Sequence, residues 1–265
     1  IIVDFLQIGV LALNKPMIQM EGIVKQFGSI TALDNMKFHA YGGEITAIVG
    51  DNGSGKSTLI QLLTGCLKPD QGVIQIKDRV FHSLTVKEAM SQGITAVYQN
   101  LALDNCKDCA GNLFLGRELL RFGIFLDYGA MYRETEKLLG QLHIHIPDIR
   151  QPVEKMSGGQ RQAVAIARAV YQNGDIMIFD EPTSAMGMKE TERIMNLFRA
   201  LKEQGKTIIL ISHNLFQVFD ISDRICVIKN GRQIDSFLTR DSSPEQLYQT
   251  IIEKEDQTDG EKMDE

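Results

Sequence analysis

Cysteine is scarce in this sequence, with four residues in 265. They are too few and too scattered for the disulfide framework of a small secreted protein. Cys106 and Cys109 form a C-x-x-C pair, but no second pair of ligands nearby completes the spacing of a structural zinc site. We therefore expect reduced thiols and a reducing, cytosolic compartment.

Long hydrophobic runs are also absent. The apolar start, Ile1–Leu13, is interrupted by Asp4 and Gln7, and it lacks the basic residues that open a signal peptide. It is shorter than the roughly 18 apolar residues of a membrane-spanning helix, and no later stretch reaches that length. We expect a protein that is at most peripheral to a membrane. Residues 1–16 precede the first strand-like pattern, and we interpret them as a non-native or flexible N-terminal extension.

The third feature that the sequence lacks is an excess of positive charge. Lys and Arg number 28 against 34 Asp and Glu, which gives a formal net charge of −6. Residues 253–265 carry −5 of this charge, so the rest of the chain is nearly neutral. We expect residues 241–265 to form a C-terminal helix and an acidic, solvated tail. Because no broad basic face is predicted, nucleic acid is not an expected partner.

Strand and helix patterns alternate along the chain. Ile45–Val49 is a short β-rich apolar run, and leucines at helical spacing follow it. Ile176–Phe179 and Thr207–Ile211 are similar runs, separated by a helical pattern over residues 194–201. This alternation predicts an α/β fold with a mainly parallel sheet. Residues 103–170 have a mostly helical pattern, which predicts a helical subdomain inserted into that fold.

A glycine-rich segment follows the first of these strands. Gly50–Ser57 reads GDNGSGKS and matches the phosphate-loop pattern G-x-x-x-x-G-K-[ST] between strand and helix. Glycines let backbone N–H groups close around phosphate oxygens, and the helix N-terminus adds partial positive charge. We expect Lys56 to reach the β- and γ-phosphates and the Ser57 hydroxyl to ligate Mg²⁺. Nucleotide contacts are predicted from Gly50, Asn52, Gly53, Ser54, Gly55, Lys56, Ser57 and Thr58.

Two acidic residues follow the strand Ile176–Phe179. A carboxylate at the C-terminal end of a parallel strand lies beside the phosphate loop, so Asp180 is a predicted Mg²⁺ ligand. Glu181 is placed to activate the attacking water as general base. Taken alone, the pair would be better interpreted as capping a helix start, since Pro182 follows. The phosphate loop in the same chain favours the catalytic interpretation.

A second glycine-containing segment, Ser157–Gln160, precedes an alanine-rich helical pattern over residues 161–170. Its backbone N–H groups could form another anion site at a helix N-terminus. Alternatively, Ser157 is an ordinary N-cap followed by two glycines in a loop. Spacing alone does not separate these two interpretations.

In order along the chain, these motifs resemble the ATP-binding subunit of an ABC transporter. The resemblance runs from about residue 18 to 232 and rests on the phosphate loop, Gln99, Met156–Gln160, Phe179–Pro182 and Ile211–His213. It implies that residues 17–240 form a phosphate-loop ATPase core with a mainly parallel sheet, an antiparallel β subdomain and the inserted helical subdomain. It also implies head-to-tail pairing of two cassettes. The loop carrying Ser157, Gly158, Gly159 and Gln160 would then face the γ-phosphate held by Lys56 of the other cassette.

Three further residues take expected roles from this resemblance. Phe27 matches the aromatic residue that stacks on adenine. Gln99 matches the residue that approaches Mg²⁺ and couples the site to the membrane subunits, and His213 matches the histidine that contacts the γ-phosphate and orients the water. Considered singly, they would be a strand-end core residue, a surface polar residue and a structural histidine.

The chain also departs from the commonest family pattern. Met156 stands where leucine is usual, Asn100 where an acid is frequent, and Gly187 where many relatives have the aspartate that helps link the two composite sites. Gly187, together with Asn112–Glu118, resembles the ATPases of bacterial importers for monosaccharides such as ribose, xylose or fructose.

The expected function is therefore ATP hydrolysis, with Mg²⁺, that drives a bacterial sugar importer. The expected partners are membrane permease subunits at the cytoplasmic face, indirectly a solute-binding protein, and a second cassette, identical or not. Two alternatives stay open: an importer of nucleosides or another small solute, and a non-transport ABC ATPase. A phosphate-loop kinase would use the same loop but has no need for Ser157–Gln160.

Overall fold

The computed structural model describes residues 15–250, and its centre is a six-stranded sheet in the order β12-β11-β3-β10-β9-β6. Strands β11 to β6 are parallel, and only β12 at the edge runs antiparallel. β3, β9 and β10 are buried along their whole length, because helices cover both faces of a parallel sheet. The bounds are β3 Ile45–Val49, β6 Ile94–Val97, β9 Ile176–Asp180, β10 Thr207–Ile211, β11 Arg224–Lys229 and β12 Arg232–Leu238.

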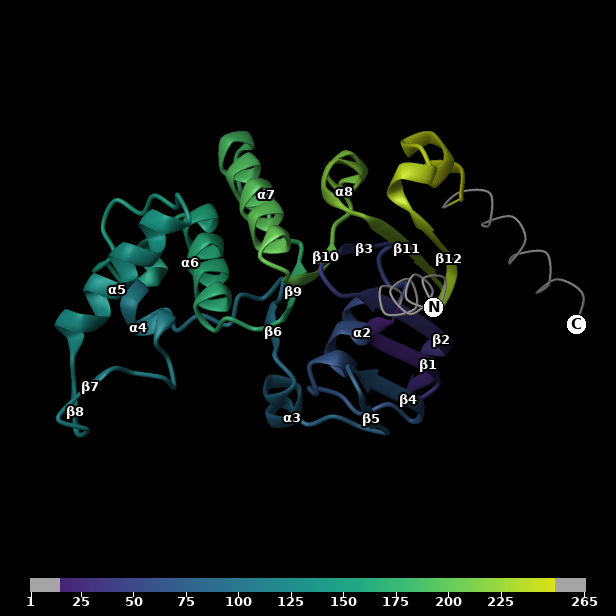
Figure 1. Ribbon diagram of the computed structural model, residues 1–265, viewed down its shortest axis with the longest axis horizontal. Helices are drawn as coiled ribbons and strands as arrows, with labels where there is room; N and C mark the ends of the chain where they lie inside the picture. Colours follow the sequence, from purple (N-terminus) through teal and green to yellow (C-terminus); the bar gives the residue numbers. More distant parts are fainter. Residues whose placement is uncertain (1–14, 251–265) are drawn as a thin grey trace, which may run out of the picture.

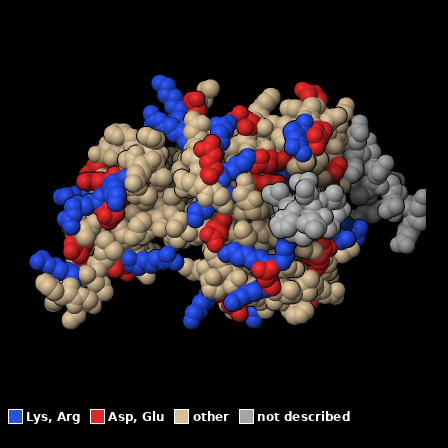
Figure 2. Space-filling view, in the orientation of Figure 1, with Lys and Arg blue, Asp and Glu red and all other residues tan. Residues whose placement is uncertain are grey.

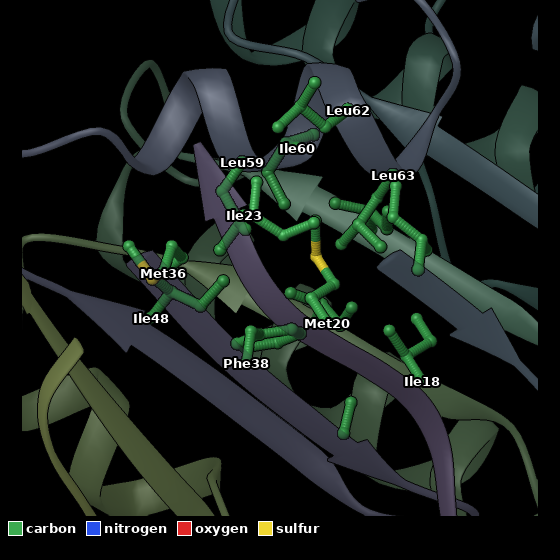
Figure 3. Packing of buried hydrophobic residues seen from close by; sticks show 14 of the residues in the cluster. Ile18, Met20, Ile23, Met36, Phe38, Ile48, Leu59, Ile60, Leu62 and Leu63 are labelled. Carbon is green, nitrogen blue, oxygen red and sulfur yellow. The ribbon is translucent and has the colours of Figure 1, made fainter. Parts of the chain in front are cut away.

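A four-stranded antiparallel sheet in the order β2-β1-β4-β5 lies beside this core, as the resemblance implied. Helix α2 (Lys56–Leu63) packs against both sheets. Its buried leucines share one hydrophobic cluster with Ile18 of β1, Phe38 of β2 and Ile48 of β3 (Figure 3). The helix that follows the phosphate loop is thereby anchored to both layers. The strand bounds are β1 Pro16–Phe27, β2 Ile30–Tyr41, β4 Gln71–Ile76 and β5 Arg79–Phe81.

Three helices form the inserted subdomain, at the left of Figure 1. They are α4 (Cys109–Leu113), α5 (Tyr128–Gln141) and α6 (Gly158–Tyr171), preceded at α6 by the 3₁₀ turn η1 (Val153–Lys155). They enclose a hydrophobic cluster of their own, while Ala165, Ile166 and Ala169 of α6 pack into the core of the parallel sheet. A short hairpin of β7 (Leu120–Arg121) and β8 (Phe125–Leu126) projects from it, with Phe122 82% and Ile124 77% exposed.

Two helices cover the sheet on the side away from α2 (Figure 1). α7 (Met188–Glu203) packs through Phe198 onto Phe179 of β9, with ring centroids 4.3 Å apart, and α8 (Leu215–Ile221) follows β10. Met195 of α7 is buried against the sheet, whereas Met188 at the start of the helix is 91% exposed. The remaining elements are α3 (Val86–Ser91), the 3₁₀ turn η2 (Thr239–Asp241) and a helix over residues 244–250.

The surface mixes both signs of charge, and Figure 2 shows Lys and Arg interspersed with Asp and Glu. Within residues 15–250, no helix combines the length and apolar character that a membrane crossing requires. All four thiols are free, and burial raises the pKa of Cys109 and of Cys226 to about 12. Residues 1–14 and 251–265 lie outside the described part of the chain, and with them most of the predicted N-terminal extension and the acidic tail.

Candidate nucleotide and catalytic site

The phosphate loop spans the connection between β3 and α2. Gly50 has φ +149°, and a Cβ there would lie 2.0 Å from the Ile228 carbonyl oxygen of β11. Gly53 has φ +82° and nothing within 4 Å of its would-be Cβ. The first glycine therefore lets the loop pack against a neighbouring strand, whereas the second keeps space free where a phosphate could approach.

Lys56, the first residue of α2, turns back over its own loop. Its Nζ donates to the carbonyl oxygens of Gly50 at 2.7 Å and Asp51 at 2.6 Å. Burial lowers the pKa of Lys56, and the nearby carboxylates of Glu181, Asp51 and Asp180 act in the opposite direction. The ammonium is thus held at the loop by neutral acceptors that an anionic ligand can replace.

Asp180 is the last residue of β9 and is 6% exposed. Burial raises its pKa, with a further contribution from Glu181, while Lys56 and the backbone N–H of Gln99 lower it. Gln99 follows β6, the strand that pairs in parallel with β9. Because neighbouring parallel strands end at the same edge of the sheet, this topology brings Gln99 to the Asp180 carboxylate.

Glu181 adopts a left-handed backbone conformation, with φ +52°. Such a conformation costs a residue with a side chain about 1–2 kcal/mol, so its surroundings must hold it. Its N–H donates to Ile211 O of β10 at 3.0 Å. Its carbonyl oxygen accepts from Gln162 Nε2 at 2.9 Å and from Ser184 Oγ at 3.1 Å.

The Glu181 carboxylate faces His213, which lies just after β10. His213 Nδ1 is 2.9 Å from Glu181 Oε1. The glutamate side chain is 15% exposed and the histidine side chain 77% exposed, so the ring lies over the carboxylate on its solvent side. Strands β9 and β10 are paired in parallel, which explains why residues at their C-terminal ends meet.

These side chains line a single cavity of about 340 Å³. Ten of the residues predicted from the sequence contribute to its wall: Asn52, Gly53, Gly55, Lys56, Ser57, Thr58, Gln99, Asp180, Glu181 and His213. Gly50 and Ser54 lie behind the loop, where Gly50 O accepts the bond from Lys56 and Ser54 is 4% exposed. The cavity wall therefore contains six of the eight predicted phosphate-loop residues together with Gln99, Asp180, Glu181 and His213.

Two predicted elements lie elsewhere. Phe27 ends β1 and is 46% exposed, with Lys25 Nζ 5.5 Å from its ring centroid. Ser157–Gln160 lines a second cavity of about 300 Å³ together with Ala185–Gly187. Ser157 is the N-cap of α6, as one interpretation predicted, and its hydroxyl accepts from Gln160 N at 3.2 Å in a capping box. The expectation that two glycines follow in a loop is wrong, because Gly158 and Gly159 are the first residues of the helix.

Four residues at the site were not predicted from the sequence: Ala32 and Ile211 in the cavity wall, and Gln162 and Ser184 on the carbonyl of Glu181. Gln162 is 3% exposed. A glutamine on the buried side of an alanine-rich helix is the signal that could have identified it, since a buried amide needs a partner.

Comparison with known proteins defines the class. The family model for the ABC transporter family matches residues 33–184. The chain is 42% identical over 228 residues to the fructose import ATP-binding protein FrcA of Rhizobium meliloti, covering 83% of this chain and 88% of that protein. It is 40% identical over 237 residues to the xylose/arabinose import ATP-binding protein XylG of Sulfolobus acidocaldarius, covering 89% and 93%.

Solved structures agree with this assignment. A nucleotide-free ATP-binding cassette from an ABC transporter superposes with a TM-score of 0.74 at 28% identity, covering 84% of this chain and 92% of the other. A cassette in a dimeric post-hydrolysis state with ADP and phosphate gives 0.75 at 26% identity, covering 84% and 99%. The fold is that of an ATP-binding cassette. The chain belongs to the ABC transporter family, and its class is that of ATPases coupled to transport.

Proposed function

We propose that the chain is the ATP-hydrolysing subunit of an importer for a monosaccharide. The observation that carries the proposal is the cavity in which Lys56, Asp180, Glu181 and His213 converge from three separate segments. A phosphate-binding loop, a carboxylate beside it and a second carboxylate paired with a histidine are the parts that nucleotide hydrolysis requires.

Binding of ATP would use the loop and its cation. The triphosphate would enter at Gly53, where no atom approaches, and take over the Lys56 ammonium from the Gly50 and Asp51 carbonyls. Phe27, half exposed at the end of β1, supplies an aromatic face on which adenine could stack.

The same cavity fits Mg²⁺. A hydroxyl from Ser57, an amide oxygen from Gln99 and the Asp180 carboxylate lie in its wall, and oxygen donors of this kind suit a hard cation. Within residues 15–250, no cluster of three or more His, Cys, Asp or Glu could hold a metal alone. One carboxylate with a hydroxyl and an amide oxygen is a donor set that suits Mg²⁺, since this ion is usually bound by one or two carboxylates together with substrate phosphates. Bound there, it would neutralise charge on the phosphate oxygens.

Glu181 and His213 would catalyse the hydrolysis step. The glutamate carboxylate would accept the proton of the attacking water, and the histidine ring would leave its present contact to orient the water and the γ-phosphate. The backbone of Glu181 is held by bonds to two other segments, so the carboxylate starts from a defined position.

A second cassette would complete each site. The Ser157–Gln160 loop lines a different cavity from the phosphate loop of its own chain. Its exposed N–H groups at the start of α6 could therefore bind phosphate only on another chain. A dimeric state of a similar cassette supports this arrangement.

The proposed sugar substrate and membrane partners are inferred from the similar proteins. Their names assign import of fructose and of xylose or arabinose to proteins that this chain matches over most of its length. By analogy, the chain would dock on permease subunits at the cytoplasmic face and receive sugar through a solute-binding protein.

The test is co-purification from native membranes followed by ATPase assays of the complex with a panel of monosaccharides. We expect a permease to co-purify and one monosaccharide to stimulate hydrolysis. Stimulation by a nucleoside or another solute alone would overturn the sugar assignment. Association with ribosomes or DNA instead of a permease would overturn the transport role.

A further inference from the structure

A buried hydrogen bond joins the first part of helix α6 to the catalytic glutamate. Gln162, 3% exposed, donates from Nε2 to Glu181 O at 2.9 Å. Its helical neighbours Ala163–Ala167 are all buried and apolar. A glutamine in such surroundings needs a partner for its amide, since a buried polar group without one is unfavourable. The Gln162–Glu181 bond is thus a fixed feature of the interior.

The hydrogen bond from Gln162 contacts Glu181, whose backbone conformation depends on hydrogen bonds from other segments. Glu181 has φ +52°, and its conformation is maintained by Ile211 O on one side and by Gln162 and Ser184 on the other. Rotation of this peptide would redirect the Glu181 side chain. Its carboxylate would then leave the position from which it contacts His213 at 2.9 Å.

The same helix carries the Ser157–Gln160 loop at its N-terminus. Gln162 lies two residues beyond it, and the first turn itself packs closely on the segment after Glu181. A Cβ on Gly158 would lie 3.2 Å from Ala185 Cβ, and one on Gly159 would lie 3.2 Å from Ala185 O. Helix α6 therefore approaches residues 181–185 at two points, through the Gln162–Glu181 hydrogen bond and at its first two glycines.

We propose that Gln162 is a positioning residue that ties the orientation of Glu181 to the placement of α6. When the Ser157–Gln160 loop seats on the nucleotide of the partner cassette, Gln162 aligns the carboxylate that acts at its own cassette's nucleotide. Each chain thereby links the two composite sites of the dimer. The inference rests on the proposed dimeric ATPase and adds to it a route of coupling within the subunit.

The experiment compares full-length wild type with Gln162→Met, which keeps the side-chain length and removes the donor. Nucleotide affinity, measured with a fluorescent ATP analogue, stays within twofold because the phosphate loop is untouched. We expect kcat to fall about tenfold or more with little change in KM. The Hill coefficient for ATP falls toward 1. The control is Gln172→Met, the same change at the far end of α6, with wild-type values expected.

A second variant, Gln162→Glu, separates positioning from packing. Its new carboxyl group could donate to Glu181 O only when protonated, and burial raises the pKa of a carboxyl group. Its rate relative to wild type should therefore rise as pH falls from 8 to 6. A kcat and Hill coefficient of Gln162→Met within twofold of wild type, or a pH-independent ratio for Gln162→Glu, would overturn the inference. Absence of ATP binding by the wild-type chain would overturn the proposed function as well.

Discussion

His213 Nδ1 and Glu181 Oε1 lie 2.9 Å apart at the ends of two adjacent parallel strands. A carboxylate can only accept, so Nδ1 is the donor and carries a proton. Nε2 is left on the other side of the ring, whose side chain is 77% exposed. The contact thus fixes the orientation of the histidine ring, which covers the more buried glutamate carboxylate from solvent.

If the two residues act as one unit, their substitutions will not be additive. Glu181→Gln removes the base and should lower kcat by at least 100-fold, and His213→Ala should lower it by roughly 10- to 100-fold. The double variant should match Glu181→Gln alone. Steady-state ATPase assays complete the cycle, and multiplicative losses in the double variant would contradict a shared role.

The same Glu181→Gln variant should accumulate as an ATP-bound dimer. The amide keeps the shape of the carboxylate but accepts no proton, so ATP stays intact between the cassettes. Size-exclusion chromatography with Mg²⁺ and ATP, against ADP as the control, measures the change. A purely monomeric elution in ATP would argue against the proposed pairing.

Lys56→Ala should weaken ATP binding itself. The ammonium is the cation directed at the phosphate loop, and a charge-assisted hydrogen bond contributes about 1.5–3 kcal/mol, or roughly 10- to 100-fold in affinity. Fluorescent nucleotide titration gives the value. Lys68→Ala, an exposed lysine outside the cavity, is the matched control. Equal affinities in the two variants would remove Lys56 from its assigned role.

Asp180→Asn should stabilise the ligand-free chain near pH 7. Folding raises the Asp180 pKa above 3.8, chiefly through burial. The free energy of unfolding of the wild type is therefore highest below that pH. It decreases as the pH rises through the folded-state pKa of Asp180, because the buried carboxyl then ionises. The asparagine suffers no such loss, so we expect a gain in the free energy of unfolding that shrinks toward acid pH. Urea denaturation from pH 4 to 8 measures it, and a pH-independent difference would contradict the prediction. Stabilisation by Mg²⁺ and ATP should decrease in the same variant.

Two glycine substitutions should separate folding from binding. Gly50→Ala places a methyl group 2.0 Å from Ile228 O and should destabilise the fold by more than about 3 kcal/mol, since backbone must move. Gly53→Ala meets no atom, and its φ of +82° should cost about 1–2 kcal/mol. Its methyl group occupies space proposed for phosphate, so ATP affinity should fall in a folded protein. Chemical denaturation and nucleotide titration test both effects. Equal destabilisation by the two variants would contradict the assignment.

Features that depend on neighbouring residues were predictable from the sequence. β3 and β10 have the predicted bounds, and α2 begins at Lys56 as the phosphate-loop pattern requires. The N-cap at Ser157 was also one of the two interpretations that the sequence offered for that segment. These elements follow local rules, because strand periodicity, glycine conformations and capping hydrogen bonds each involve a few consecutive residues.

Contacts between distant segments required the tertiary structure. The sequence has no pattern that pairs Glu181 with His213, 32 positions later, or Gln162 with the Glu181 carbonyl. Nor does it show that Ser157–Gln160 and Lys56 of the same chain line two different cavities. Strand order in the parallel sheet decides which chain ends meet at one edge, and the packing of α6 decides which backbone its buried amide finds. The motifs of a nucleotide site can thus be identified from the sequence. Which of these motifs line the same cavity of one chain, and which line a different one, depends on the fold.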